Sequence, residues 1–201
     1  MQHRARISPR LIAAVVLLAA LAIVLVLNLT DADPPSRAQR RAASERVLAA
    51  MPVAERFSLL ARARTNRCDL RARELHEMSN RMRLRSACCF PMDRTRYAQQ
   101  LRGLRPYRRS GLVPSDPYDV SVGLAKRLLR YRKIELGKRG QAIYHQGTKA
   151  SSLGGPCCCP CWRWQAFKGQ ARFMIARHHY SAARIAALWD LEEGCGGPAE
   201  T

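Results

Sequence analysis

Residues 156–195 of this 201-residue chain read PCCCPCWRWQAFKGQARFMIARHHYSAARIAALWDLEEGC. In this stretch four clustered cysteines are followed by two helix-forming segments. The pattern predicts a helix over Trp162–Arg177 and a second over Ala182–Glu193, with Ser181 as the N-cap of the second. At about 1.5 Å per residue, the two helices are about 24 Å and about 18 Å long. A short turn at 178–180 joins them, so the sequence predicts a C-terminal αα-hairpin.

The hairpin brings the cysteine at its end back toward the cysteines at its start. Cys195 follows the second helix within a Gly-Cys-Gly-Gly segment, and these glycines permit a close backbone approach. Cys195 is therefore expected to lie near Cys161. His178 and His179 lie at the far end of the hairpin, which excludes them from a site built around these cysteines.

The clustered cysteines predict a metal site. Cys158 and Cys161 form a C-x-x-C pair, and Cys159 and Cys161 form a C-x-C pair, so that two thiolates reach one ion. The thiols precede a helix N-terminus, where the dipole and the free amides favour the thiolate form that binds soft metals. Cys195 is the predicted closing ligand. The predicted core ligands are Cys157, Cys158, Cys159 and Cys161.

A second pair, Cys88–Cys89, also precedes a predicted helix and has Met92 nearby. Adjacent thiols with a thioether suit a soft ion such as Cu(I), so Cys88 and Cys89 are predicted as a further contribution to the site. The ion is zinc, copper or the iron of an iron–sulfur cluster, and the sequence does not choose among them. Cys68 stands apart and is predicted to be a small core residue.

Two other interpretations of the thiols stay open. The main alternative is a structural or interaction protein whose cysteines form disulfides, as exported domains permit. Adjacent cysteines pair poorly with each other, since their Cα atoms are about 3.8 Å apart and a disulfide needs roughly 4.4–6.8 Å. The second is redox chemistry, because Cys158-Cys159-Pro160-Cys161 resembles the C-x-P-C centre of thioredoxin-like proteins. The βαβ pattern of that family is not found here.

Other chemistry finds little support in the sequence. P-loop, G-x-S-x-G and H-E-x-x-H motifs are all missing, so an enzyme is the less expected class. The second hairpin helix carries Arg184 against three acidic residues, which makes nucleic acid an unexpected partner. No feature indicates a particular protein partner.

The middle of the chain is predicted to be helical and to lack a sheet. Ser36 caps a helix that ends before Pro52. An amphipathic, arginine-rich helix of about thirty residues is expected over 53–82, either straight or bent near Thr65–Asn66.

Three further helices are expected before the cysteine cluster. Asp93 caps the first, which ends at Gly103, and Asp119 caps the second, over 120–133. A weaker helix is expected over 141–153.

Near the start, Leu11–Leu29 reads LIAAVVLLAALAIVLVLNL, with Asn28 as its one polar residue. A helix of this length is about 28 Å long and crosses a hydrocarbon layer of about 30 Å. The run is too long for a typical cleaved signal peptide and lacks a small-x-small site after it, which predicts a single-pass anchor in membrane lipid. The basic segment before it favours export of the residues beyond the anchor, so the soluble part is expected to be extracytoplasmic.

The chain carries 35 Lys and Arg against 15 Asp and Glu, a net charge of +20. Arginines dominate the region after the anchor, for which a solvated stalk and contact with anionic lipid headgroups are the two leading interpretations. The sequence thus predicts a mainly α protein with a transmembrane helix and a small helical soluble domain. Its expected parts are a basic segment 1–10, an anchor 11–29, a linker 30–36, an arginine-rich helical region 37–110, and a helical cysteine-rich domain 111–201.

Overall fold

The computed structural model describes residues 47, 48 and 50–197. From Met51 onward the chain forms one compact unit. The predicted membrane anchor at 11–29 and nearly all of the predicted helix after Ser36 lie outside the described residues. None of the described helices has the length and the apolar character that crossing a bilayer requires.

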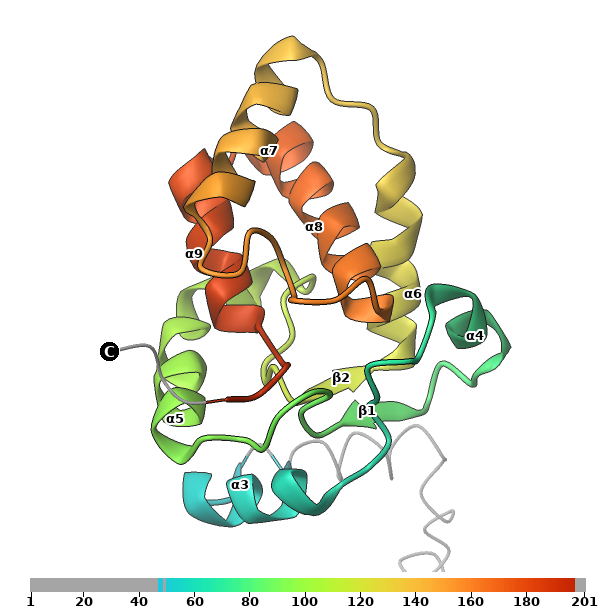
Figure 1. Cartoon of the computed structure of the whole chain (residues 1–201), viewed down its shortest axis with the longest axis vertical. Helices are drawn as coiled ribbons and strands as arrows, with labels where there is room; N and C mark the ends of the chain where they lie inside the picture. The colour runs from blue at the N-terminus through green and yellow to red at the C-terminus, as the bar shows by residue number, and fades with distance from the viewer. Residues whose placement is uncertain (1–46, 49, 198–201) are drawn as a thin grey trace, which may run out of the picture. The chain divides into compact units, whose positions relative to one another are not determined.

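The described unit is mainly helical, as predicted, and four helices lie together at one end of it (Figure 1). They are α6 (Val122–Arg130), α7 (Lys138–Ala150), α8 (Trp162–His178) and α9 (Ala182–Glu192). The closest pairings are α6 with α8 and α7 with α9. Trp162, Phe167 and Trp189 are fully buried between them and form the centre of the largest apolar core.

The two C-terminal helices run antiparallel, as predicted. Ser181 caps α9 with its side chain. Near the start of α8, Arg163 donates a hydrogen bond to the carbonyl of Glu192 at the end of α9, at 2.9 Å. Farther along, the indole N–H of Trp189 donates to the carbonyl of Phe167. The residues that follow α9 therefore return to the beginning of α8.

A short β-ribbon lies at the other end of the unit, and the prediction that the chain lacks a sheet is wrong. Strand β1 (Arg83–Arg85) pairs antiparallel with β2 (Asp119–Ser121), with Leu84 opposite Val120. Both of these central side chains are fully buried. Three-residue strands are too short to show an alternating pattern in the sequence. The pairing also joins the regions 37–110 and 111–201 within one unit.

Asp119 belongs to this ribbon and does not cap a helix, so that prediction is wrong. Its buried carboxylate accepts hydrogen bonds from Arg83 and Arg85, at 2.7 and 3.2 Å. Two guanidinium groups thus balance its charge. Ser121 caps the helix in its place, and α6 begins at Val122.

The prediction of one helix over 53–82 is wrong as well, because the helix is interrupted, and not merely bent, around Thr65–Asn66. The chain forms two shorter helices there, α3 (Val53–Arg62) and α4 (Ala72–Glu77). Between them the buried Asn66 side chain donates to the carbonyl of Ser86 at 2.9 Å and accepts from the indole N–H of Trp162 at 2.8 Å. These two hydrogen bonds hold Asn66 against Ser86 and Trp162. A continuous helix over 53–82 would not allow both contacts.

The remaining elements follow the prediction more closely. Asp93 caps α5 (Arg94–Gly103), and α5 ends at the expected glycine. Helix α7 covers 138–150 against the predicted 141–153. Two short 3₁₀ helices complete the unit, η1 (Arg105–Ser110) and η2 (Tyr131–Lys133).

Candidate metal centre

Four distant segments of the chain bring all eight cysteines together. They contribute Cys68, the pair Cys88–Cys89, the run 157–161, and Cys195. Overlapping groups of three sulfur atoms, each within 4.8 Å of one another, connect the eight. The prediction that Cys68 is an isolated core residue is wrong, because it lies between α3 and α4 and its sulfur joins this cluster.

Backbone hydrogen bonds hold two of these segments side by side. The N–H groups of Cys89 and Phe90 both donate to the carbonyl of Cys195, at 3.1 and 2.7 Å. Farther along, the N–H of Gly197 donates to the carbonyl of Pro91 at 2.9 Å. The segment after α9 therefore lies along the Cys88–Cys89 segment, and this pairing positions the sulfur of Cys195.

Gly196 allows this close approach. Its φ is +85°, in the left-handed region that favours glycine. A Cβ at this position would collide with the carbonyl oxygen of Phe90. The close backbone approach predicted for the glycines around Cys195 is confirmed here.

The cysteine run is fixed at the start of α8, as predicted. Cys161 is the residue before the helix, and its N–H donates to the carbonyl of Cys159 at 2.8 Å in a tight turn. The N–H of Trp162 donates to the carbonyl of Leu70 at 3.0 Å. This bond connects the run to the segment that carries Cys68.

Four thiols form the buried part of the cluster, and we name them the inner set: Cys88, Cys157, Cys161 and Cys195. The sulfur of Cys157 lies 3.7 Å from that of Cys161 and 2.8 Å from that of Cys195. The sulfur of Cys88 lies within 4.8 Å of that of Cys195. Apart from Cys88, which is half-buried, the members are at most 2% exposed.

The other four cysteines, which we name the outer set, form the more exposed part: Cys68, Cys89, Cys158 and Cys159. Cys68 and Cys89 form a disulfide. The sulfur of Cys158 lies 3.8 Å from that of Cys89, and the sulfur of Cys159 lies 4.0 Å from that of Cys68. Cys89, predicted as a ligand together with Cys88, is therefore crosslinked and offers no free thiolate in this structure.

Hydrogen bonds within the inner set favour thiolates at two positions. The thiols of Cys157 and then Cys88 lower the pKa of Cys195 by hydrogen bonding to its sulfur. A hydrogen bond from Cys161 is the main cause that lowers the pKa of Cys157. The corresponding hydrogen bonds raise the pKa of Cys88, which keeps its proton. The deprotonated sulfur that soft metals need is thus favoured in the buried centre.

Buried charged residues bind the backbone beside Cys195, a member of the inner set. The N–H of Cys195 donates to the carboxylate of Glu193, which forms an ion pair with Arg96 at 2.9 Å. The fully buried guanidinium of Arg163 holds the carbonyl of Glu192. These contacts fix the backbone next to Cys195. Sequence reasoning missed them, since charged residues at a helix end are usually solvated and nothing in the pattern marks these as buried.

Part of the inner set has a spacing close to that around a single tetrahedral ion, and a four-thiolate site needs Cys88 to move toward Cys157 and Cys161. Zn–S bonds are about 2.3 Å long, so sulfurs around one zinc are roughly 3.8 Å apart. The Cys157–Cys161 distance of 3.7 Å matches this value, whereas the Cys157–Cys195 distance of 2.8 Å has to open by about 1 Å. An iron–sulfur cluster places several irons and sulfides between its cysteines and needs wider spacing. The chain is thus cysteine-rich, with a disulfide and cysteine clusters able to hold a metal ion.

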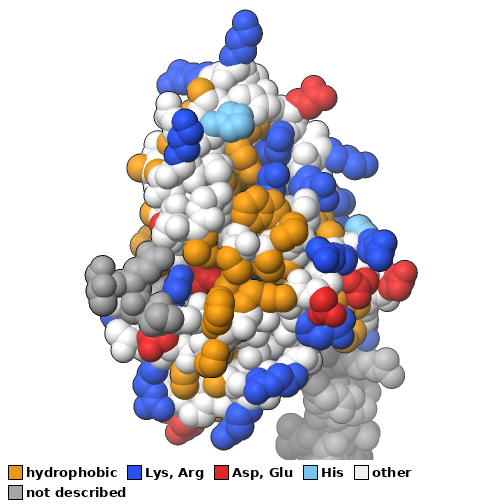
Figure 2. Space-filling model, viewed as in Figure 1, with side chains coloured by type: hydrophobic (Ala, Val, Ile, Leu, Met, Phe, Trp, Pro, Cys, Tyr) orange, Lys and Arg blue, Asp and Glu red, His pale blue; other side chains and the backbone are white. Residues whose placement is uncertain are grey.

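A basic groove lies outside the cysteine cluster, between α4 and the end of α6. Two adjoining cavities of about 600 and 370 Å³ share Ala72, Arg73 and Arg132 in their walls. Arg130 and Lys133 add further positive charge, and no carboxylate lines either cavity among the described residues. Figure 2 shows Lys and Arg around the viewed face, with hydrophobic side chains gathered toward its middle. Contact with anionic headgroups stays a prediction. Its candidate surface among the described residues is this basic groove.

The resemblance to thioredoxin-like centres ends at the four residues that carry it. Burial is the main cause that raises the pKa of the exposed Cys158 to about 12, so this thiol is a poor nucleophile near neutral pH. The described residues form only one two-stranded ribbon, without a βαβ unit. Among known proteins, no family profile, no curated sequence and no solved structure matches this chain.

Proposed function

We propose that this protein binds one thiophilic metal ion, preferably zinc, through the thiolates of the inner set. One observation carries the proposal: distant segments place three buried sulfurs, those of Cys157, Cys161 and Cys195, beside the half-buried Cys88, and hydrogen bonds lower the pKa of Cys157 and Cys195. Cys157, Cys161 and Cys195, which the sequence predicts as ligands, are three of the four. Cys88 is the fourth, taken from the predicted second pair.

The proposed ion has a structural or carrier role and not a catalytic one. Four protein ligands close the coordination sphere of zinc, whereas catalytic sites keep one position open for water or substrate. The ion would also join the segments of Cys88, the cysteine run and Cys195. Its binding energy therefore adds to the stability of the fold.

The test is the metal content of the full chain, purified in detergent with zinc supplied and without chelators. We expect one zinc per chain. Cys195→Ser and Cys161→Ser should lose nearly all of it, because three thiolates and a hydroxyl bind zinc much more weakly than four thiolates do. Cys158→Ser, in the outer set, is the matched control and should keep its zinc. Zinc that survives the loss of Cys195 would contradict the proposal.

A structural disulfide protein is the second candidate, favoured by the observed Cys68–Cys89 crosslink. Cys157 and Cys195 are also close enough to be oxidised with little backbone movement. Titration of free thiols in the denatured, metal-free chain separates the candidates. Six free thiols fit the metal proposal, and none fits the disulfide alternative.

For location, we propose that residues 11–29 anchor the chain in a membrane as a single span, with the described unit outside the cytoplasm. The length and apolar character of that run support it, as does the basic segment before it. A reporter enzyme active only outside the cytoplasm, fused after Thr201, is expected to be active. Activity of a reporter that works only in the cytoplasm would reverse the orientation, and release of the chain by alkaline carbonate would rule out the span.

A further inference from the structure

We propose that the outer set becomes a second metal site when the Cys68–Cys89 disulfide is reduced, so that the redox state sets how many ions the chain binds. The inference rests on the proposed function of the inner set. It adds Cys68, Cys89, Cys158 and Cys159 as the ligands of a second thiophilic ion, again preferably zinc.

Three sulfurs of the outer set already lie close together, and the fourth, that of Cys158, lies near Cys89. Cys68, Cys89 and Cys159 form a group whose sulfurs all lie within 4.8 Å of one another. The Cys89–Cys158 and Cys68–Cys159 distances of 3.8 and 4.0 Å are close to the roughly 3.8 Å edge of a zinc–thiolate tetrahedron. The disulfide holds two of the four sulfurs too close together for an ion, and its reduction frees them.

The adjacent cysteines explain how two sites fit in one cluster. Cys88 contributes to the inner set and Cys89 to the outer set, and Cys157 and Cys158 are divided in the same way. The sulfurs of Cys88 and Cys89 lie 3.6 Å apart, so this pair stands where the two sets meet. Eight cysteines thus form two sets of four, with none left over.

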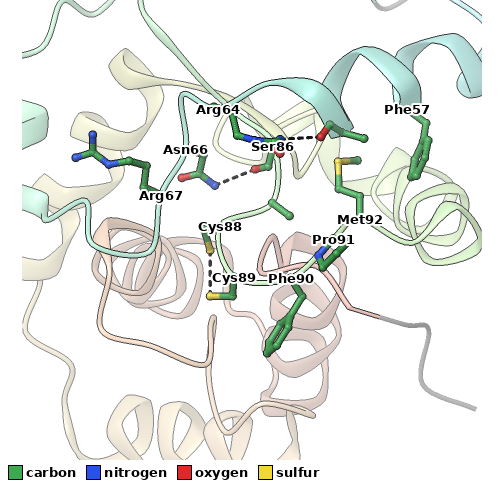
Figure 3. Close-up of a pocket in the computed structure, with 12 residues that line it drawn as sticks. Phe57, Arg64, Asn66, Arg67, Ser86, Cys88, Cys89, Phe90, Pro91 and Met92 are labelled. Atoms are coloured by element: carbon green, nitrogen blue, oxygen red, sulfur yellow. Dashed lines mark hydrogen bonds between the residues drawn. The ribbon is translucent and has the colours of Figure 1, made fainter.

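A cavity gives reductants access to the disulfide. It has a volume of about 520 Å³, and Cys88 and Cys89 form part of its wall. Figure 3 shows the sulfur atoms of these two residues near each other, with Phe90 beside them and Arg67 on another side of the opening. Arg64 also lines this cavity. A zinc ion with four thiolates carries a charge of −2, and the positive charge of Arg64 partly compensates it.

The chemical steps balance with a dithiol as the reductant. The dithiol transfers two electrons and two protons to the Cys68–Cys89 bond and becomes a cyclic disulfide itself. Two thiols result. Binding of zinc by the four thiols of the outer set then forms four Zn–S bonds and releases four protons. Oxidation of the emptied site by a disulfide of the same class closes the bond again.

The test counts zinc in the full chain before and after reduction. One sample is kept as purified, and the other is treated with dithiothreitol, desalted without oxygen, and equilibrated with zinc. We expect one zinc per chain in the first sample and two in the second. Cobalt in place of zinc should double the sulfur-to-cobalt charge-transfer absorbance on reduction, which reports thiolate ligands directly.

Two variants locate the second ion. The Cys68→Ser/Cys89→Ser double variant should bind one zinc in both states, and Cys161→Ser should bind none as purified and one after reduction. Circular dichroism checks that each variant is folded. One zinc in both states of the unaltered chain would overturn this inference and leave the proposed function standing. Two in both states would overturn the redox dependence, and none in either state would overturn both proposals.

Discussion

Gly196→Ala is expected to weaken zinc binding by about 100-fold, even though no ligand is changed. The added Cβ collides with the carbonyl oxygen of Phe90 and pushes the segment after α9 away from the Cys88–Cys89 segment. The sulfur of Cys195 then moves out of the inner set, because the backbone bonds that position it are lost. Competition with a chromophoric zinc chelator measures the affinity.

Gly197→Ala is the matched control for this variant. Gly197 also has a positive φ, +95°, but a Cβ there meets nothing within 4 Å. It should carry only backbone strain, about 1 kcal/mol, and lose less than about tenfold in affinity. Equal losses of zinc affinity in the two variants would show that backbone strain causes the effect. The collision with the carbonyl of Phe90 would then not explain it.

Glu192→Gln is expected to stabilise the folded chain by roughly 4 to 5 kcal/mol at pH 9 and to change its stability little at pH 4. Burial raises the pKa of this fully buried carboxyl to about 8, against an ordinary value of 4.5. One carboxyl oxygen accepts a hydrogen bond from the amide of Gln170, at 2.6 Å. The carbonyl oxygen of a glutamine can accept the same bond, so the variant keeps this contact.

The sign follows from where the proton is held. Between pH 4.5 and about 8 the folded chain keeps the proton on Glu192, whereas the unfolded chain releases it. The contribution of this group is thus fully present below pH 4.5, and about 1.4 kcal/mol is lost for each pH unit up to about 8. Glutamine does not titrate, so the free energy of unfolding of the variant does not fall with pH through this group.

Urea unfolding of both proteins at pH 5, 7 and 9 gives the difference in free energy. The difference is the informative quantity, because titration of the cysteines affects both proteins alike. A constant difference across this range would show that Glu192 does not hold its proton in the folded state.

The parts that the sequence predicts well are those specified by local chemistry. Ser181 and Asp93 cap helices where their side chains accept a backbone hydrogen bond. The length of α8 and α9 is enough to predict that Cys195 returns to the cysteine run, and the structure places its sulfur 2.8 Å from that of Cys157.

The parts that the sequence does not predict depend on partners far along the chain. The apolar spacing over 53–82 is typical of a helix, but Asn66 takes its hydrogen bonds from residues 20 and 96 positions away. Cys68 joins the cluster only because that helix is interrupted. One feature of the sequence points to its role. The other seven cysteines are an odd number, so one of them needs Cys68 if all are to form pairs.

The separation of the sulfur-bearing segments has a consequence for how the chain folds. Sulfur contacts of 4.0 Å or less between different segments span 21 to 91 residues, so long loops must close before the cluster exists, and assembly of this kind is slow. During that delay the thiols are open to oxidants and stray ions. Neighbouring cysteines cannot readily bond to each other, which removes the fastest erroneous crosslinks from competition. Refolding yield should therefore depend on how soon the distant segments meet.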